Sequence, residues 1–203
     1  MKIAIIGATG NAGSRLLEEA LRRHHSVTAI ARKASSLTPR DRLTAHDIDV
    51  HDSAALAQVL QGHDAVLSSG RFATITAADI IGPVRQAGIK RLLVVGGAGS
   101  LEVAPGMALI DTPQFPAEYK AESGAGRNFL QELRQETELD WSFLSPSALF
   151  IPGERTGVFR LGQDQLLTAA DGKSWISMED YAIAMLDETE KPAHIRQRFT
   201  VGY

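Results

Sequence analysis

The chain has 203 residues, with 21 basic and 24 acidic side chains and no cysteine. This length predicts a single domain, residues 1–203, with a large core. The balanced charge offers no basic run for nucleic acid or an anionic membrane, and the lack of cysteine excludes disulfides, thiolate metal sites and a cysteine nucleophile. The lack of cysteine is also typical of the reducing cytoplasm, where we expect the protein to act.

The opening MKIAIIGATG has a short apolar run, which predicts a buried strand and neither a signal peptide nor a membrane span.

Strand-like and helix-like segments alternate along most of the chain. Apolar or β-branched runs predict strands at 2–7, 26–32, 42–50, 64–70, 91–97 and 141–146. Amphipathic or apolar runs between them predict helices at 11–25, 53–62, 75–88 and 116–136. The alternation predicts an α/β fold, a Rossmann-like doubly wound parallel sheet with helices on both faces.

The C-terminal part, residues 146–203, has a different pattern. ALFIPGERTG at 148–157 is rich in proline, glycine and apolar residues and predicts a loop. Segment 160–177 predicts a short hairpin or strand pair, followed by a helix at 179–188 and a last strand at 197–203. We expect this part to supply substrate-side loops, because ligands of open α/β sheets bind beyond the carboxyl ends of the strands.

The sharpest motif is GATGNAG, which leaves the first strand and opens the first helix. Its glycines let the backbone turn tightly and approach a pyrophosphate, and the helix N-terminus offers free N–H groups to the anion. The side chains of Thr9 and Asn11 can add donors, while a glycine-rich turn without a ligand is the alternative. The predicted dinucleotide-binding residues of this loop are Gly7, Thr9, Gly10, Asn11, Ala12 and Gly13.

The second predicted strand ends in Ala31-Arg32-Lys33, without the acidic residue that usually accepts from the ribose hydroxyls of NAD. A guanidinium can instead pair with a 2′-phosphate, so we predict NADP(H) binding through Arg32, with a solvated arginine as the alternative. Further predicted cofactor contacts are Asp49 and Val50 at the adenine, Ser68, Ser69 and Gly70 beneath the cofactor, and Gly97 at the end of the fifth strand.

Several segments together resemble a known family: GATGNAG, DIDVHD, GHDAVLSSG, VVGGAGSL, FPAEYK, LDWSFLSPSALFIPGERTG and EDYAIAMLDE. They resemble the atypical short-chain dehydrogenase/reductase group, and within it the NADH-flavin reductase set related to NmrA-like proteins and biliverdin reductase B. The resemblance covers nearly the whole chain. It implies a Rossmann fold, NADP(H) binding, and hydride transfer to FMN, FAD, a quinone or another planar acceptor. It also implies that Pro146 approaches the nicotinamide, although Pro146 also suits a plain strand end.

The segment EYKAES departs from the pattern of carbonyl-reducing members of that group, which carry Tyr-x-x-x-Lys. Tyr119 is followed four residues later by Ser123, and Lys120 would point about 100° away round a helix. The tyrosine–lysine acid–base pair is therefore not built in this form. Ser100, after the fifth strand, and Tyr119 are the predicted catalytic residues, in a role of binding or orienting the substrate.

Flavin or quinone reduction needs a flat apolar slot more than a proton relay. The predicted slot residues, for each of which ordinary packing is the alternative, are Phe72, Met107, Leu109, Phe115, Leu149, Phe150 and Pro152. No metal site is predicted, because the six histidines lack ligand spacing.

Two other functions stay open. One is a non-catalytic NADP(H) sensor of the NmrA type that reports the redox state to a partner protein. The other is a reductase or epimerase acting on a carbonyl through Tyr119 and Ser100. We expect a monomer or homodimer that binds a small planar molecule, with no nucleic-acid or membrane partner.

Overall fold

The computed structural model describes all residues, 1–203, and has one large sheet. Its eight strands lie in the order β10-β12-β8-β5-β4-β1-β2-β3, and only the edge strand β10 runs antiparallel to its neighbour. The strands are β1 Lys2–Ile6, β2 Ser26–Ala31, β3 Leu43–Asp47, β4 Ala65–Ser68, β5 Arg91–Val95, β8 Asp140–Pro146, β10 Arg160–Gly162 and β12 Gln197–Gly202. Two small sheets pair β6 Glu102–Ala104 with β7 Met107–Ala108, and β9 Leu149–Ile151 with β11 Trp175–Ser177.

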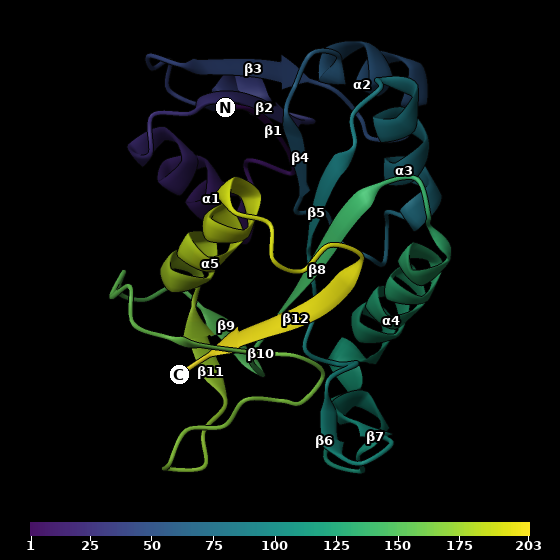
Figure 1. The fold of residues 1–203 in the computed structure, drawn as a ribbon, viewed down its shortest axis with the longest axis vertical. Helices are drawn as coiled ribbons and strands as arrows, with labels where there is room; N and C mark the ends of the chain where they lie inside the picture. The colour runs from purple at the N-terminus through teal and green to yellow at the C-terminus, as the bar shows by residue number, and fades with distance from the viewer.

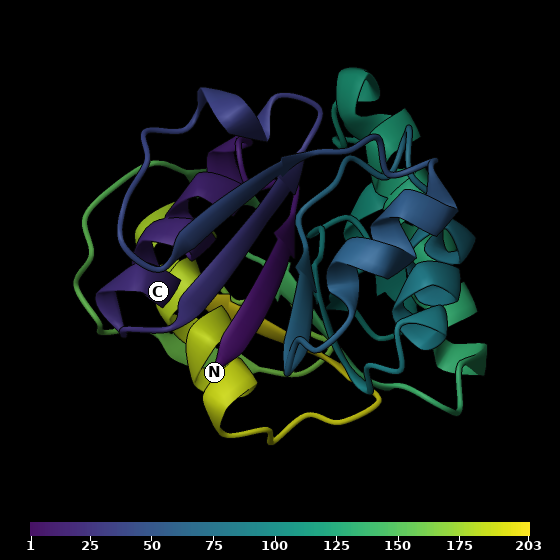
Figure 2. The same ribbon diagram turned by 90° about the horizontal axis from the view of Figure 1, so that it is seen from above.

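Helices cover both faces of the large sheet (Figures 1 and 2). Helices α1 Asn11–Arg22 and α5 Met178–Glu190 pack on one face, and α2 Ser53–Leu60, α3 Ala77–Gln86 and α4 Lys120–Gln135 pack on the other. Each face has its own apolar core, because residues of the buried parallel strands point alternately to the two sides. None of the helices has the length and apolar character that a membrane crossing requires.

The order of the strands reverses at β1. Strands β2 and β3 extend the sheet to one side of β1, while β4, β5, β8 and β12 extend it to the other. The parallel strands all end at the same edge, so the carboxyl ends of β1 and β4 flank the switch point at which ligands of such sheets bind.

The alternating α/β architecture predicted from the sequence is confirmed, with element ends shifted by a few residues. The hairpin predicted at 160–177 is wrong. β10 pairs antiparallel with β12, and β11 pairs parallel with β9, so the two strands of this segment have different partners. Both partners are remote in sequence, and the local pattern of the segment carries no information about them.

Helix α1 ends at Arg22, earlier than predicted, and His24 then adopts a left-handed φ of 63°. The side chain of His63, after α2, is buried between α2 and β2. Its Nε2 lies 2.7 Å from Thr28 Oγ1 and its Nδ1 lies 2.8 Å from the carbonyl oxygen of Leu60. Burial lowers the pKa of His63 below its ordinary value of 6.5.

This depressed pKa predicts a loss of stability on mild acidification. Below pH 6.5 the unfolded chain protonates His63 more readily than the folded chain does. The stabilisation is complete above that pH and is lost as the pH falls through the lower folded pKa. We expect the free energy of unfolding, measured by urea titration, to fall between about pH 7 and pH 5, and to fall less in His63→Gln. An equal fall in the variant would assign the effect to other groups.

Candidate functional site

The turn between β1 and α1 carries the GATGNAG segment. Gly7 has a φ of 80°, and a Cβ there would lie 2.5 Å from the carbonyl oxygen of Ser69. A Cβ at Gly13 would lie 2.1 Å from the carbonyl oxygen of Gly7. Both glycines are therefore required by the close approach of α1 to β1 and of this turn to the end of β4.

Helix α1 begins at this turn without a capping side chain. Its N-cap is Gly10, whereas α2, α3 and α5 each have a side chain that accepts from the first helical turn. The first N–H groups of α1 thus point toward the turn without a side-chain partner, at the positive end of the helix dipole. Thr9, Gly10 and Asn11 are exposed and Ala12 is half-buried, so a ligand can reach the predicted phosphate-binding residues.

Arg32 follows β2 directly. It is exposed and forms no ion pair. The neighbouring strand β3 ends beside it, because Ala31 pairs with Asp47. Ser35 donates to both carboxylate oxygens of Asp47, at 2.7 and 2.6 Å, and these bonds lower the pKa of Asp47. The carboxylate of Asp47 is therefore already engaged by Ser35, and the Arg32 guanidinium forms no ion pair.

Asp49 and Val50 follow β3 at the same edge of the sheet as Arg32. Asp49 is exposed, and its carboxylate accepts from the backbone N–H of His51 at 3.0 Å. Val50 is half-buried against the core under α2 and α3. The structure thus brings both predicted adenine contacts to the strand ends beside Arg32.

The other predicted cofactor residues lie at the ends of neighbouring strands. Ser68 is buried as the last residue of β4, opposite Ile6 of β1, and Ser69 contacts Gly7. Gly70 follows them, Gly97 comes two residues after the end of β5, and Pro146 is the buried last residue of β8. The carboxyl edge of the sheet therefore carries the whole predicted set.

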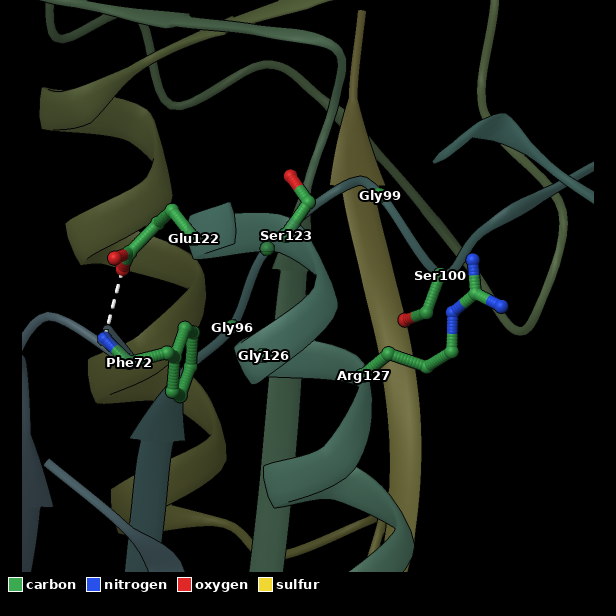
Figure 3. A pocket seen from close by; sticks show the side chains of 9 residues that line it. Phe72, Gly96, Gly99, Ser100, Glu122, Ser123, Gly126 and Arg127 are labelled. Atoms are coloured by element: carbon green, nitrogen blue, oxygen red, sulfur yellow. Dashed lines mark hydrogen bonds between the residues drawn. The ribbon is translucent and has the colours of Figure 1, made fainter. Parts of the chain in front are cut away.

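A pocket of about 110 Å³ lies beside this edge, between the segment after β5 and helix α4 (Figure 3). Its lining is formed by Phe72, Gly96, Gly97, Gly99, Ser100, Glu122, Ser123, Gly126 and Arg127. Two of the glycines allow α4 to pack closely against the segments that follow β5 and β4. A Cβ at Gly99 would lie 2.6 Å from the Cβ of Ser123, and one at Gly126 would lie 2.9 Å from the Phe72 ring.

Glu122 fixes the segment after β4 against α4. Its carboxylate accepts from the backbone N–H of Phe72 at 2.7 Å and of Ala73 at 2.9 Å, and Figure 3 shows the first of these bonds. The centroid of the Phe72 ring lies 5.1 Å from that of Phe129 and 6.0 Å from that of Phe143. The negative charge of Glu122 is thus satisfied by backbone donors, and this wall of the pocket is held in place.

Ser100 contacts an arginine that the sequence analysis did not single out. Arg198 of β12 has a side chain that is 4% exposed, and its Nη1 donates to Ser100 Oγ at 3.3 Å. Its Nε donates to Asp164 at 2.7 Å. The one charged residue of the last strand, QRFTVG, was the available signal, but its partner is 98 residues away in the sequence.

Tyr119 lies outside the pocket. Helix α4 begins at Lys120 and not at residue 116, and Tyr119 belongs to a preceding 3-10 turn, Ala117–Tyr119. Its side chain is 59% exposed. Ser123, at the position where a Tyr-x-x-x-Lys motif has its lysine, does line the pocket with Ser100. The structure therefore brings one of the two predicted catalytic residues into the pocket and leaves the other at the surface.

The seven predicted slot residues do not gather in this pocket. Phe72 is the only one of them in its lining. Phe150 packs on Tyr181, with ring centroids 4.6 Å apart, while Met107 and Leu149 are exposed on β7 and β9. The other members sit on separate small sheets and loops, so the slot as a whole stays a prediction.

A family model described as NAD(P)H-binding matches residues 7–192. The chain belongs to the NAD(P)H-binding family. The match covers the phosphate loop, the pocket and helix α5, and it confirms the resemblance to atypical short-chain dehydrogenase/reductase proteins.

Three solved structures resemble this NAD(P)H-binding protein along its whole length. A Burkholderia pseudomallei protein provisionally named as exported is 45% identical, with a TM-score of 0.92 and full coverage of both chains. A Bacteroides thetaiotaomicron protein provisionally named an epimerase is 43% identical, with a TM-score of 0.94 over 100% of this chain and 96% of the other. A Streptococcus pneumoniae protein provisionally named an NADH-flavin reductase is 36% identical, with a TM-score of 0.86 over 100% and 99%. The family match and the relatives named an NADH-flavin reductase and an epimerase support an NAD(P)H-dependent oxidoreductase with a Rossmann fold.

Proposed function

We propose that this protein is an NADPH-dependent reductase that transfers hydride to a planar acceptor, such as FMN, FAD or a quinone. The observation that carries the proposal is the uncapped N-terminus of α1 at the strand switch point, on the same carboxyl edge of the sheet as the pocket between β5 and α4. The provisional name of the Streptococcus pneumoniae relative supports the acceptor class. Bound NADPH would supply the hydride.

The residues of the chain would do the positioning. Gly7 and Gly13 let the backbone approach the pyrophosphate, and the free N–H groups of α1 receive its charge. The segment after β4, fixed by Glu122, would lie beneath the cofactor. The glycine-lined pocket leaves room for part of the acceptor, and its two serine hydroxyls can donate hydrogen bonds. Rate enhancement would then come mainly from holding the donor and acceptor rings at reacting distance.

The preference for NADPH rests on Arg32, the unpaired guanidinium after β2. We expect Arg32→Ala to weaken NADPH binding by about 100-fold, because two charge-assisted hydrogen bonds to the 2′-phosphate are lost. NADH binding should change by less than about 2-fold, since NADH has no phosphate at that position. Isothermal titration of both cofactors measures this, with Lys33→Ala as the neighbouring control. Equal affinities of the wild-type protein for NADPH and NADH would contradict the role of Arg32.

A carbonyl reductase or epimerase acting through Tyr119 is the competing enzyme. The provisional name of the Bacteroides thetaiotaomicron relative favours it, whereas the exposure of Tyr119 and the serine at the lysine position favour the planar acceptor. Flavin or quinone reduction should survive Tyr119→Phe with its kcat within about 2-fold of wild type, as measured by NADPH oxidation. Loss of all turnover in that variant would support the competing enzyme.

The location and assembly of the protein are part of the same proposal. We propose that the protein is a cytoplasmic monomer or homodimer. The lack of cysteine fits a reducing compartment such as the cytoplasm. The Burkholderia pseudomallei relative, provisionally named as exported, marks the alternative. Cell fractionation followed by size-exclusion chromatography with light scattering distinguishes these cases.

A further inference from the structure

The hydroxyl of Ser100 has a defined direction. Arginine has only donor groups, so the contact with Arg198 Nη1 at 3.3 Å makes Ser100 Oγ the acceptor. The proton of Ser100 then has to point elsewhere, and Ser100 makes no other side-chain hydrogen bond. Ser100 lines the pocket between β5 and α4 (Figure 3). Its free O–H donor is therefore available to a ligand in this pocket.

The cation behind Ser100 is buried and fixed. Arg198 is 4% exposed, and its Nε and Nη2 both donate to Asp164 Oδ1. A hydroxyl that accepts from a guanidinium becomes a stronger donor, because hydrogen bonds in a chain polarise one another. The guanidinium of Arg198, paired with Asp164, thus lies one hydrogen bond behind Ser100.

The pocket has the size and polarity for one polar group of the acceptor. Its volume of about 110 Å³ is below the roughly 150 Å³ that holds a benzene ring. Ser123 adds a second hydroxyl from α4 that has no partner in the protein, while the carboxylate of Glu122 is satisfied by backbone N–H groups. Two hydroxyl donors with a cation behind one of them suit an oxygen on which negative charge develops.

We propose that Arg198 is a positioning residue that acts through Ser100, and that the pair donates a hydrogen bond to a carbonyl oxygen of a quinone acceptor. This inference rests on the proposed reductase function. NADPH, the quinone and one proton from water give NADP⁺ and the hydroquinone. The hydride carries the two electrons, and the charge that appears on the quinone oxygen is stabilised by Ser100 until that oxygen is protonated.

The test compares two hydride acceptors. Menadione has carbonyl oxygens, whereas crystal violet accepts hydride at carbon and has none. We expect Ser100→Ala to lower kcat/KM for menadione by on the order of 100-fold, as does removal of a donor to a developing oxyanion. Arg198→Gln should lower it by roughly 10-fold. Neither variant should change kcat/KM for crystal violet or NADPH affinity by more than about 2-fold. Equal losses with both acceptors would overturn the proposal.

A double-mutant cycle separates action through Ser100 from a merely structural effect. Adding Arg198→Gln to Ser100→Ala should cause no further loss of kcat/KM, whereas additive losses would show that Arg198 acts independently. Arg196→Gln is the matched control, since Arg196 immediately precedes β12, is half-exposed and lies 3.5 Å from Asp140.

A binding measurement covers the case in which the wild-type protein reduces neither menadione nor crystal violet. Calorimetric titration of menadione into the NADP⁺ complex should then still show binding that is at least about 10-fold weaker in Ser100→Ala. Equal binding by the two proteins, or none by either, would overturn the carbonyl site itself.

Discussion

Gly13→Ala is expected to abolish measurable NADPH binding and to lower the free energy of unfolding by about 1–3 kcal/mol. The added Cβ would lie 2.1 Å from the carbonyl oxygen and 2.8 Å from the carbonyl carbon of Gly7. Both are backbone atoms, so no side chain can rotate away, and α1 has to move from β1. Because the free N–H groups of α1 move with it, the anion site is lost together with the packing.

The matched control is Gly82→Ala, another glycine-to-alanine change inside a helix. A Cβ at Gly82 would meet nothing within 4 Å, so alanine should stabilise α3 by up to about 1 kcal/mol. Cofactor titration and urea unfolding of both variants measure the two effects. Wild-type NADPH affinity in Gly13→Ala would contradict the assignment of this turn as the phosphate loop.

Glu188→Ala is expected to lower the free energy of unfolding by about 3–5 kcal/mol, because it leaves a buried charge without its partner. Glu188 Oε1 lies 2.8 Å from Arg91 Nη2, and the two side chains are 3% and 9% exposed. Burial alone raises the pKa of Glu188, but hydrogen bonds from His194, Ala193 and Ser142 lower it below its usual value. The carboxylate thus joins the end of α5 to β5 and β8.

Glu190→Ala is the control for this pair. Glu190 lies on the same helix, is 32% exposed and pairs with Arg23 and His25. Its removal should cost no more than about 1 kcal/mol, because Glu190 is partly exposed and Arg23 keeps Glu19 and Asp187 as partners. Urea unfolding at neutral pH compares the two variants. If the free energy of unfolding falls no more in Glu188→Ala than in Glu190→Ala, the buried Arg91 does not depend on Glu188 for its stability.

Much of the fold could be predicted from local patterns. Buried strands such as KIAII and RLLVV are continuous apolar runs, and α1 has a clear apolar face, so the β-α alternation followed from the residues. The pairing of β9 with β11 and of β10 with β12 could not be predicted in this way. These short strands are placed by the larger elements on either side of them.

The cofactor side of the site was easier to predict than the substrate side. The close backbone approach in the GATGNAG turn joins Gly13 to Gly7, which are near each other in the sequence. The spacing of the glycines was therefore enough to predict this part of the site. The pocket depends on contacts between remote segments, such as that of Gly99 with Ser123 and that of Ser100 with Arg198. Tyr119 shows the same limit. It belongs to a 3-10 turn before α4, and this turn leaves its side chain at the surface.

The most direct test of the central claim is NADPH oxidation by the purified protein with FMN, FAD, riboflavin, quinones and a triphenylmethane dye, with NADH measured in parallel. The proposed function predicts turnover with at least one planar acceptor, a preference for NADPH over NADH, and loss of that preference in Arg32→Ala. Tight NADPH binding without turnover on any acceptor would contradict the reductase and favour a sensor that reports the redox state of the cofactor to a partner protein.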